Sequence, residues 1–307
     1  MNMKKTKIYI VGSGAIGKAL AVFLQLENKA VVLVRGSVDH IPDSEDQITV
    51  IGKERTFKQS IVTTTFNGLK TINGIVLIAS KAFANEEIAG KLREKAGDFS
   101  IVLLQNGLHV ERPFQGFDRV YRCVLFSTSQ VTGHNEVTFK SVTSSPVGNV
   151  QGNNEGLEEV VDMIDTVEFG FRSEPDITVQ VWTKVIVNCA FNSICPLLET
   201  DNGIFVRNPE AAKLARTVID ECVSLAQKQG IDLDSDTIEK NLMLISQRSE
   251  GQLISTYVDI LHNRRTEIDS LNLEVFRVAD EMGVAKTVEH TKLLGELIQL
   301  KSAIKIK

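Results

Sequence analysis

The sequence predicts an α/β domain followed by an all-helical domain, and three observations support this division. Short β-rich runs alternate with helical segments through the first part of the chain. A turn-forming segment with Pro175 then interrupts the pattern. Beyond it, apolar residues recur at helical spacing over 176–195, 208–230, 235–254, 266–282 and 286–303. We therefore expect one domain over residues 1–174 and a second over 175–307.

The first strand, turn and helix form a dinucleotide-binding pattern. A β-rich run at 7–11 precedes the turn, and helical periodicity leads on to a second strand at 30–34. The turn itself reads Gly12, Ser13, Gly14, Ala15, Ile16, Gly17. A G-x-G-x-x-G segment between a strand and a helix is typical of Rossmann-type domains, because the glycines allow a tight turn, close approach of a pyrophosphate and helix packing. The N–H groups at the start of the helix also favour phosphate.

The end of the second strand favours NADP(H) as the cofactor. NAD-binding sites usually place an acidic residue there, whereas this sequence has Arg35. A guanidinium can bind a 2′-phosphate and stack on adenine. Asp39, four residues later, leaves NAD open as the alternative.

Further strands are predicted at 74–79, 100–104 and 122–126. Lys81 follows the first of them and Asn106 follows the second. Both are candidate cofactor contacts, because ligands of open parallel sheets lie outside the carboxyl ends of the strands. The structural alternatives are a solvated helix start for Lys81 and a left-handed turn at Asn106 and the glycine after it. Residues 131–150 alternate and contain turn formers, which predicts a β-hairpin extension.

The first helix of the second domain carries an unusual line of polar residues. Lys184, Asn188 and Asn192 follow one another at a spacing of four in an otherwise apolar segment that Pro196 ends. A solvated face is the simple interpretation. However, a helix that is apolar almost all round is expected to be buried, and a buried ammonium requires a partner or a shifted pKa. We expect this polar line to face a ligand.

Composition excludes several functional classes. The net charge of −5 and the absence of a dense basic patch give no reason to expect nucleic acid. No apolar run reaches the roughly 18 residues of a membrane helix, and the basic N-terminus runs into the glycine turn, so we expect a cytoplasmic protein. The cysteines form no C-x-x-C pair and the histidines are isolated in sequence, so we expect neither a disulfide framework nor a metal site.

Several segments in the same order carry a family resemblance. They are GSGAIG at 12–17, Arg35, SKA at 80–82, LQNG at 104–107, WTKVIVNCAFN at 182–192, DNG at 201–203 and ISTYVDILHNRRTEIDSLN at 254–272. Over nearly its full length the chain resembles the ketopantoate reductase (2-dehydropantoate 2-reductase) family. The resemblance implies NADPH-dependent reduction of a small 2-oxo acid in pantothenate biosynthesis, with ketopantoate as the leading substrate.

The resemblance also implies a role for each matching residue. Lys184 would be the general acid, and Glu267 the acidic partner that positions the substrate hydroxyl and influences the lysine. Asn188 would bind the substrate oxygen beside Lys184, which agrees with the need of a developing oxyanion for a nearby proton donor and a neutral hydrogen-bond donor. The remaining implied contacts are Asn192, Asn202 and Ser255 for the substrate, with Ser255 on its carboxylate, and Lys81 and Asn106 for the cofactor, with Asn106 close to the nicotinamide ribose.

Two departures from the family pattern leave the substrate open. Thr256 stands where the family usually has Met, and Asn263 where it usually has Gly. The alternatives are a reductase of another 2-oxo acid and a non-catalytic NADP-binding sensor, which would not need Lys184, Asn188 and Glu267. The helical half has enough apolar faces for a homodimer, although surface and interior stripes look alike in sequence.

Overall fold

The computed structural model describes residues 6–150 and 154–305 and divides the chain into two compact units. The α/β unit comprises the chain up to Gln105 together with Val110–Ile177. The helical unit comprises Asn106–His109 and the chain from Thr178 onward. The predicted fold class, an α/β region followed by a helical region, is confirmed.

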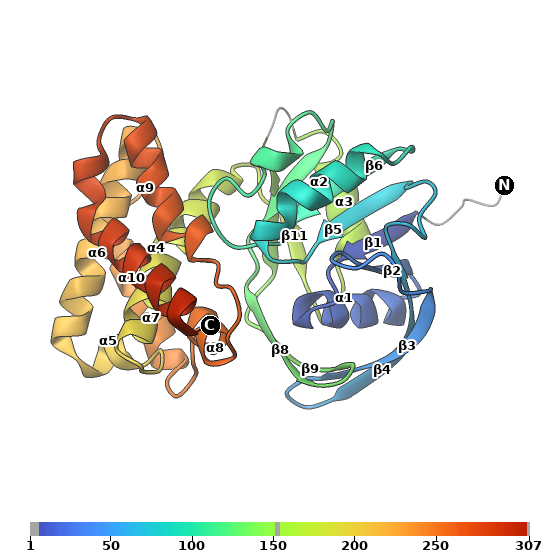
Figure 1. Cartoon of the computed structure of the whole chain (residues 1–307), viewed down its shortest axis with the longest axis horizontal. Coiled ribbons are helices and arrows are strands. Elements are labelled where there is room, and N and C mark those ends of the chain that lie inside the picture. Colours follow the sequence, from blue (N-terminus) through green and yellow to red (C-terminus); the bar gives the residue numbers. More distant parts are fainter. Residues whose placement is uncertain (1–5, 151–153, 306–307) are drawn as a thin grey trace. The chain divides into compact units, whose positions relative to one another are not determined.

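Within the described residues, the α/β unit contains a single mixed sheet of eleven strands (Figure 1). The strands are β1 Lys7–Val11, β2 Ala30–Arg35, β3 Ser44–Ile51, β4 Thr56–Thr65, β5 Gly74–Ile78, β6 Phe99–Leu103, β7 Val120–Cys123, β8 Ser127–Gly133, β9 Glu136–Ser141, β10 Ser145–Asn149 and β11 Phe171–Ser173. Their order is β11-β10-β7-β6-β5-β1-β2-β4-β3-β9-β8. Strand β1 is parallel to both β2 and β5, so the order of the strands reverses next to the glycine turn. Such a reversal is where open α/β sheets bind their ligands.

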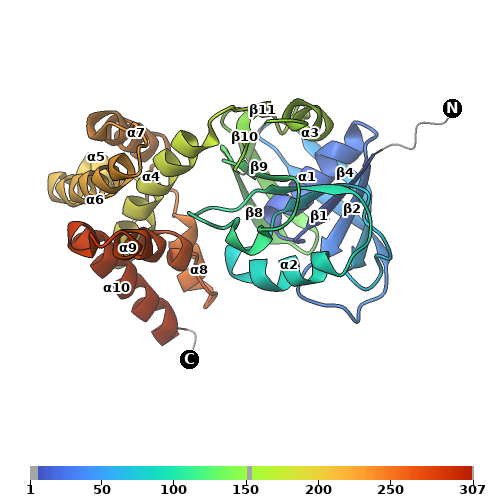
Figure 2. The ribbon, with the colours of Figure 1, turned by 90° about the horizontal axis from the view of Figure 1, so that it is seen from above.

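Helices cover both faces of the central strands. Successive side chains of β1 point to opposite faces, so Ile8 packs with α1 (Ala15–Leu26) and α3 (Leu157–Ile164), while Tyr9 packs with α2 (Asn85–Arg93). Figure 2 shows α2 and α3 on opposite sides of the strands. Burial on both faces explains why these strands read as continuous apolar runs.

The structure contains one hairpin that the sequence did not predict, and a second hairpin whose limits differ from the prediction. Strands β3 and β4 pair antiparallel, and with β8 and β9 they curve around α1 (Figure 1). Phe23 of α1 makes edge contacts with Phe57 and Phe139 inside this curve, with ring centroids 5.3 and 5.0 Å apart. The hairpin predicted over 131–150 is instead a hairpin over 127–141, because β10 pairs antiparallel with β7 and parallel with β11. The strand predicted at 122–126 lies earlier, at β7.

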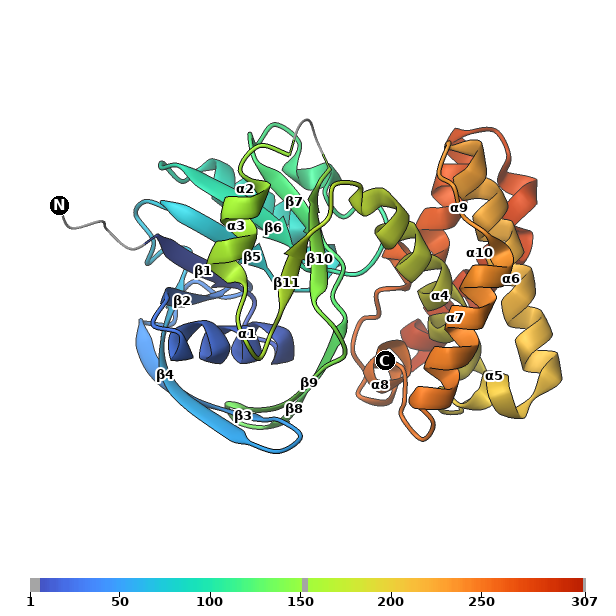
Figure 3. The ribbon, with the colours of Figure 1, turned by 180° about the vertical axis from the view of Figure 1, so that it is seen from behind.

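The helical unit consists of α4 and the shorter elements around it (Figure 3). They are α4 Ile177–Leu197, α5 Ile204–Arg207, α6 Pro209–Lys228, α7 Ser235–Arg248, α8 Ser255–Leu261, α9 Asn272–Glu281, α10 Glu289–Lys305 and the 3₁₀ turns η3 Ile268–Ser270 and η4 Ala285–Val288. Apolar residues of α4, including Trp182 and Ile186, share a core with α6, α7 and α9. Within residues 6–150 and 154–305, none of the helices combines the length and apolar character that a membrane crossing requires.

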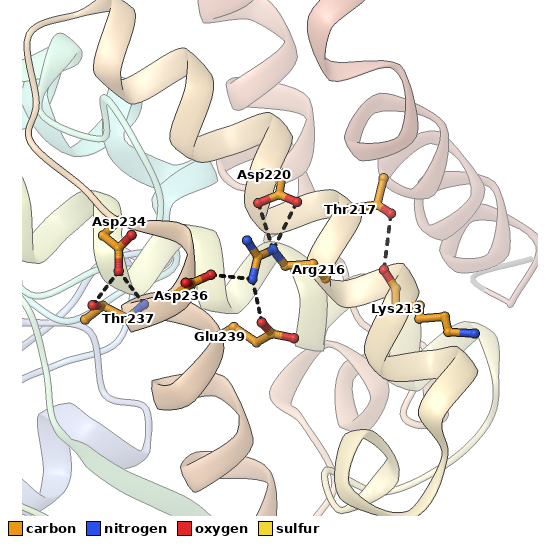
Figure 4. A network of polar contacts seen from close by, with 8 residues as sticks. All are labelled: Lys213, Arg216, Thr217, Asp220, Asp234, Asp236, Thr237 and Glu239. Carbon is orange, nitrogen blue, oxygen red and sulfur yellow. Dashed lines mark hydrogen bonds and ion pairs between the residues drawn. The ribbon is translucent and has the colours of Figure 1, made fainter.

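Polar side chains begin and connect these helices. Asn208 accepts hydrogen bonds from Glu210 N and Ala211 N at the start of α6, and Asp234 accepts one from Thr237 N at the start of α7. Figure 4 shows Arg216 of α6 between three carboxylates. Its guanidinium lies 2.9 Å from Asp220 Oδ1, 2.8 Å from Asp236 Oδ1 and 2.6 Å from Glu239 Oε2, which joins α6 to α7.

Three predicted helix limits differ from the structure. Pro196 lies in the last turn of α4, which ends one residue later at Leu197. The helix predicted over 235–254 ends at Arg248, and the following loop contains Gly251 in the left-handed region at φ 76°. The helix predicted over 266–282 is divided into η3 and α9 by Leu271. A break of this kind leaves the apolar spacing nearly unchanged, so periodicity alone does not reveal it.

The end of α8 explains one departure from the family pattern. Asn263 has φ 53°, in the left-handed region that glycine and asparagine adopt most readily. Its N–H donates to Ile260 O at 3.1 Å, and Arg264 N donates to Asp259 O at 2.8 Å. These two bonds form a Schellman cap, which most often uses glycine. Asn263 therefore performs the backbone role of the family's glycine.

We predict that Asn263→Ala lowers the free energy of unfolding of the helical unit by about 1 kcal/mol, because alanine is disfavoured in the left-handed region. Asn263→Gly should remain within about 0.5 kcal/mol of wild type, since glycine relieves strain but loses more chain entropy. Urea unfolding followed by fluorescence of Trp182, the single tryptophan, measures both. Equal stability of the two variants would contradict this account of the cap.

Candidate active site

The glycine turn of the α/β unit is fixed by close backbone contacts. Gly12 has φ 119°, and a Cβ on it would lie 2.6 Å from Ser80 N. A Cβ on Gly17 would lie 1.9 Å from the carbonyl oxygen of Gly12, so α1 packs directly on the turn. Gly12 N also donates to Val34 O at 2.9 Å, which ties the turn to β2. Gly12 and Gly17 therefore have the packing roles that the sequence predicts for them.

The same turn leaves space for a phosphate group. Gly14 is the N-cap of α1, and within 4 Å of its ideal Cβ position the described residues place no atom from outside the immediate chain. The N-cap residue Gly14 has no side chain that could cap the first N–H groups of α1, and the first turn of this helix contains no acidic residue. Ser80 Oγ is buried and has no hydrogen-bond partner in the part of the chain that the structure describes. Exposed backbone donors beside an unpaired hydroxyl suit the pyrophosphate of a dinucleotide.

Arg35 lies in a cluster of charges at the end of β2. Its Nη2 donates to Ser44 Oγ at 2.6 Å and lies 3.4 Å from Asp46 Oδ2. Ser44 Oγ donates in turn to Asp46 Oδ1 at 3.1 Å. Burial lowers the pKa of Lys18, and the negative charge of Asp46 opposes this effect. Two cations and a hydroxyl thus surround one carboxylate at the position where a dinucleotide carries its adenosine ribose.

Asp39, the acidic residue that kept NAD as the alternative cofactor, has a cationic partner. Lys91 Nζ donates to Asp39 Oδ2 at 2.7 Å, and this hydrogen bond holds the pKa of Asp39 below its usual range. The arginine at the end of β2 pairs with Asp46 instead. Ser44 and Asp46 were not predicted as partners of Arg35 because they lie in strand β3, which no sequence pattern predicted. Strands β2 and β3 follow each other in the chain but are separated by β4 in the sheet.

The two candidate residues after β5 and β6 lie in different surroundings. Lys81 precedes the 3₁₀ turn η1 (Ala82–Ala84), has extended backbone and is partly buried. Asn106 follows β6 in the sequence but belongs to the helical unit, which also contains Lys184 and Glu267. The sequence gives no sign that Asn106 belongs to the helical unit, because this membership depends on contacts with residues far along the chain.

The polar line of α4 connects this helix to α8. Lys184 and Asn188 are partly buried, whereas Asn192 is 3% exposed. Asn192 Nδ2 donates to Asn188 O at 3.1 Å, and its Oδ1 lies 3.4 Å from both Ser255 Oγ and Thr256 N. The side chain of Asn192 therefore satisfies donors in the first turn of α8, where the N-cap residue Ile254 supplies no side-chain cap. This brings Ser255 next to the polar line.

Asn202 and Glu267 are the remaining predicted site residues. The backbone of Asn202 is held on both sides, because its N–H donates to Gln252 O at 2.9 Å and its carbonyl accepts from Ser246 Oγ at 2.6 Å. Asn202 Oδ1 is buried and has no hydrogen-bond partner among the described residues. Glu267 precedes η3 and is 8% exposed. The helical unit thus contains a lysine, a glutamate and several amide side chains that are partly or fully buried.

Comparison with known proteins identifies relatives along the whole chain. The family model described as "Ketopantoate reductase PanE/ApbA" matches residues 8–152, and that described as "Ketopantoate reductase PanE/ApbA C terminal" matches residues 176–302. The 2-dehydropantoate 2-reductase of Streptococcus pyogenes serotype M6 is 24% identical over 305 residues, covering 97% of this chain and 98% of that protein.

Solved structures show the same fold. The dimeric ketopantoate reductase of Staphylococcus aureus superposes with a TM-score of 0.82 at 22% identity, covering 97% of this chain and 99% of that one. A D-mandelate dehydrogenase in ternary complex with NADH and anilino(oxo)acetate superposes with a TM-score of 0.88 at 20% identity, covering 98% of this chain and 99% of that one. Because both halves match family models and a relative aligns over nearly the full length, this chain belongs to the ketopantoate reductase family.

Proposed function

We propose that this protein reduces 2-dehydropantoate (ketopantoate) to pantoate with NADPH. The observation that carries the proposal is the connection between α4 and α8, in which Asn192 places Ser255 beside the helix that carries Lys184 and Asn188. A 2-oxo acid presents a ketone oxygen and a carboxylate, and this arrangement offers donors for both. The family membership supports the same reaction.

The proposed roles follow from the chemistry of each side chain. The nicotinamide supplies the hydride that reduces the ketone carbon. Lys184 donates a proton to the ketone oxygen as negative charge develops on it, and the Asn188 amide donates a hydrogen bond to the same oxygen. Ser255 Oγ binds the substrate carboxylate, and Glu267 accepts from the hydroxyl of the product. Asn192 and Asn202 complete the substrate pocket.

The proposed cofactor is NADP(H), held by residues of the α/β unit. The backbone from Gly12 to Gly17 binds the pyrophosphate, and Arg35 binds the 2′-phosphate of the adenosine ribose. Lys18 adds a second positive charge near Asp46, and Ser44 offers a hydroxyl to the same phosphate. Lys81 and Asn106 contact the remainder of the cofactor.

Another 2-oxo acid is the second candidate substrate, and the fold supports testing it. The D-mandelate dehydrogenase with this fold acts on a 2-hydroxy acid with an aromatic side chain. Thr256 is buried directly beside Ser255 and is smaller than the methionine that the family usually has there. The corresponding oxo acid, 2-oxo-2-phenylacetate, therefore belongs in any substrate panel.

The proposed assembly is a homodimer. The ketopantoate reductase of S. aureus with the same fold is dimeric, which supports this expectation.

We predict that ketopantoate has the highest kcat/KM in a panel of 2-oxo acids that includes 2-oxo-2-phenylacetate, measured as NADPH oxidation. Lys184→Ala should lower kcat by about 10²- to 10⁴-fold, because general acid catalysis contributes a factor of that size. Lys213→Ala, an exposed lysine of α6, is the matched control and should leave kcat unchanged. A preference for the aromatic acid would select the second candidate. Tight NADPH binding without any turnover would contradict the enzyme proposal and favour a sensor.

We predict that Arg35→Ala lowers kcat/KM for NADPH by about 10- to 100-fold and has little effect on kcat/KM for NADH, because hydrogen bonds to a charged group contribute roughly 1.5–3 kcal/mol. Asp46→Asn should shift the preference further toward NADPH, because it removes a carboxylate that competes for Arg35. Glu45→Gln is the matched control, since Glu45 lies on the opposite face of β3 and contacts Ser60. Equal losses with both cofactors in Arg35→Ala would show that Arg35 does not bind the 2′-phosphate.

A further inference from the structure

A short segment after β6 is packed into the helical unit. Residues Asn106–His109 belong to that unit, although Gln105 before them and Val110 after them belong to the α/β unit. The Leu108 side chain is 4% exposed and lies in the core that α4, α6 and α9 share. The segment is therefore held by the helical unit although it continues from a strand of the sheet.

The segment contacts the helical unit through its backbone, at the backbone of Ser270. Leu108 N donates to Ser270 O at 2.9 Å. Gly107 has φ 108°, and a Cβ on it would lie 2.5 Å from both Ser270 Cβ and Ser270 O and 2.6 Å from Ser270 Oγ. Only glycine fits here, because both the backbone conformation and the surrounding atoms exclude a side chain. We call this contact, formed by Gly107, Leu108 and Ser270, the Gly107 joint.

A side-chain hydrogen bond holds the far end of the segment. His109 has φ 52°, and its Nδ1 lies 2.9 Å from Glu274 Oε1 in α9. Glu274 is 5% exposed and also pairs with Arg277. A non-glycine residue in the left-handed region is uncommon, so contacts at both ends fix this segment in an unusual conformation.

The Gly107 joint connects two residues of the proposed site. Ser270 ends the turn η3, and both its N–H and its Oγ donate to Glu267 O at 3.0 Å. Asn106 immediately precedes Gly107 on the other side of the joint. The connection from Glu267 to Asn106 therefore runs through the hydrogen-bonded turn that ends at Ser270, the hydrogen bond from Leu108 N to Ser270 O, and the residues Leu108 and Gly107. It includes no flexible side chain.

We propose that the Gly107 joint is a positioning device that fixes Asn106 in register with Glu267. This inference rests on the proposed function, in which Asn106 contacts the cofactor and Glu267 the substrate. Gly107, Leu108 and Ser270 are positioning residues that act through Asn106. The register matters because a displacement of about 1 Å in a reacting pair can cost on the order of 10²-fold in rate.

The first test asks whether the joint exists in solution, without any substrate. Amide hydrogen exchange of Leu108, measured by NMR, should be slowed at least about 100-fold relative to an unstructured peptide, because its N–H is bonded and buried. Gly107→Ala should remove most of this protection. Gly230→Ala is the matched control, since Gly230 has φ 79° in the same unit and open space around its Cβ position. Rapid exchange of the Leu108 amide in wild type would overturn the joint itself.

The second test asks whether the joint acts through Asn106. Gly107→Ala should lower kcat by about 10- to 100-fold while the NADPH dissociation constant stays within about threefold, because the glycine turn and Arg35 remain intact. Gly230→Ala should leave both unchanged. The double variant Asn106→Ala with Gly107→Ala should be no slower than the slower single variant, because two changes that act through one side chain do not add.

The outcomes separate the joint from the proposed function. Additive losses in the double variant, or an unchanged kcat in Gly107→Ala, would overturn the positioning role. A wild-type protein that reduces no 2-oxo acid would overturn the proposed function, and the positioning role would fail with it. In that case the exchange rate of Leu108 would still decide whether the joint exists.

Discussion

The side chain of Asn192 is the interaction on which the helical part of the site depends. Helix α4 is buried on most of its surface, so each polar group along its line requires a hydrogen-bond partner. Asn192 meets this requirement by bonding to the carbonyl of Asn188 and to donors in the first turn of α8. One amide thus fixes the distance between two helices that both carry candidate substrate contacts. Asn192, which the sequence predicts as a substrate contact, therefore also holds the first turn of α8 against α4.

In the α/β unit, backbone geometry has the role that the Asn192 side chain has in the helical unit, because it fixes the arrangement of the candidate site. Gly12 and Gly17 are required by contacts of the turn with Ser80 and with α1, and the space around the Cβ position of Gly14, the N-cap of α1, is open. Charge is then added at a separate point, where Arg35, Lys18 and Asp46 gather at the end of β2. In the function we propose, the backbone of the turn binds the pyrophosphate of the dinucleotide, and the side chains at the end of β2 select between NADP(H) and NAD(H).

Local patterns were sufficient to predict the parts of this protein that depend on local sequence. The glycine turn, the central strands and α4 were all identified from spacing and composition, since the glycine spacing and the apolar runs are each contained in a short stretch of sequence. The hairpin of β3 and β4 was missed because its outer residues are polar or exposed, and its partners β2 and β9 come from other parts of the chain. The partners of Arg35 and Asn192, and the membership of Asn106 in the helical unit, depend on contacts between distant residues that no local pattern contains. Asn263 differs from the family in sequence but has the glycine-like backbone conformation, which became visible only from its φ angle.

The central claim is that this protein transfers a hydride from a nicotinamide cofactor to the C2 carbon of a 2-oxo acid. NADPH carrying deuterium in the transferable position at C4 of the nicotinamide, incubated with the protein and ketopantoate, tests it most directly. The account predicts pantoate with one deuterium at C2 for each cofactor oxidised, detected by NMR and mass spectrometry. Cofactor oxidation that yields no deuterium at C2, or cofactor binding without any hydroxy acid product, would contradict it.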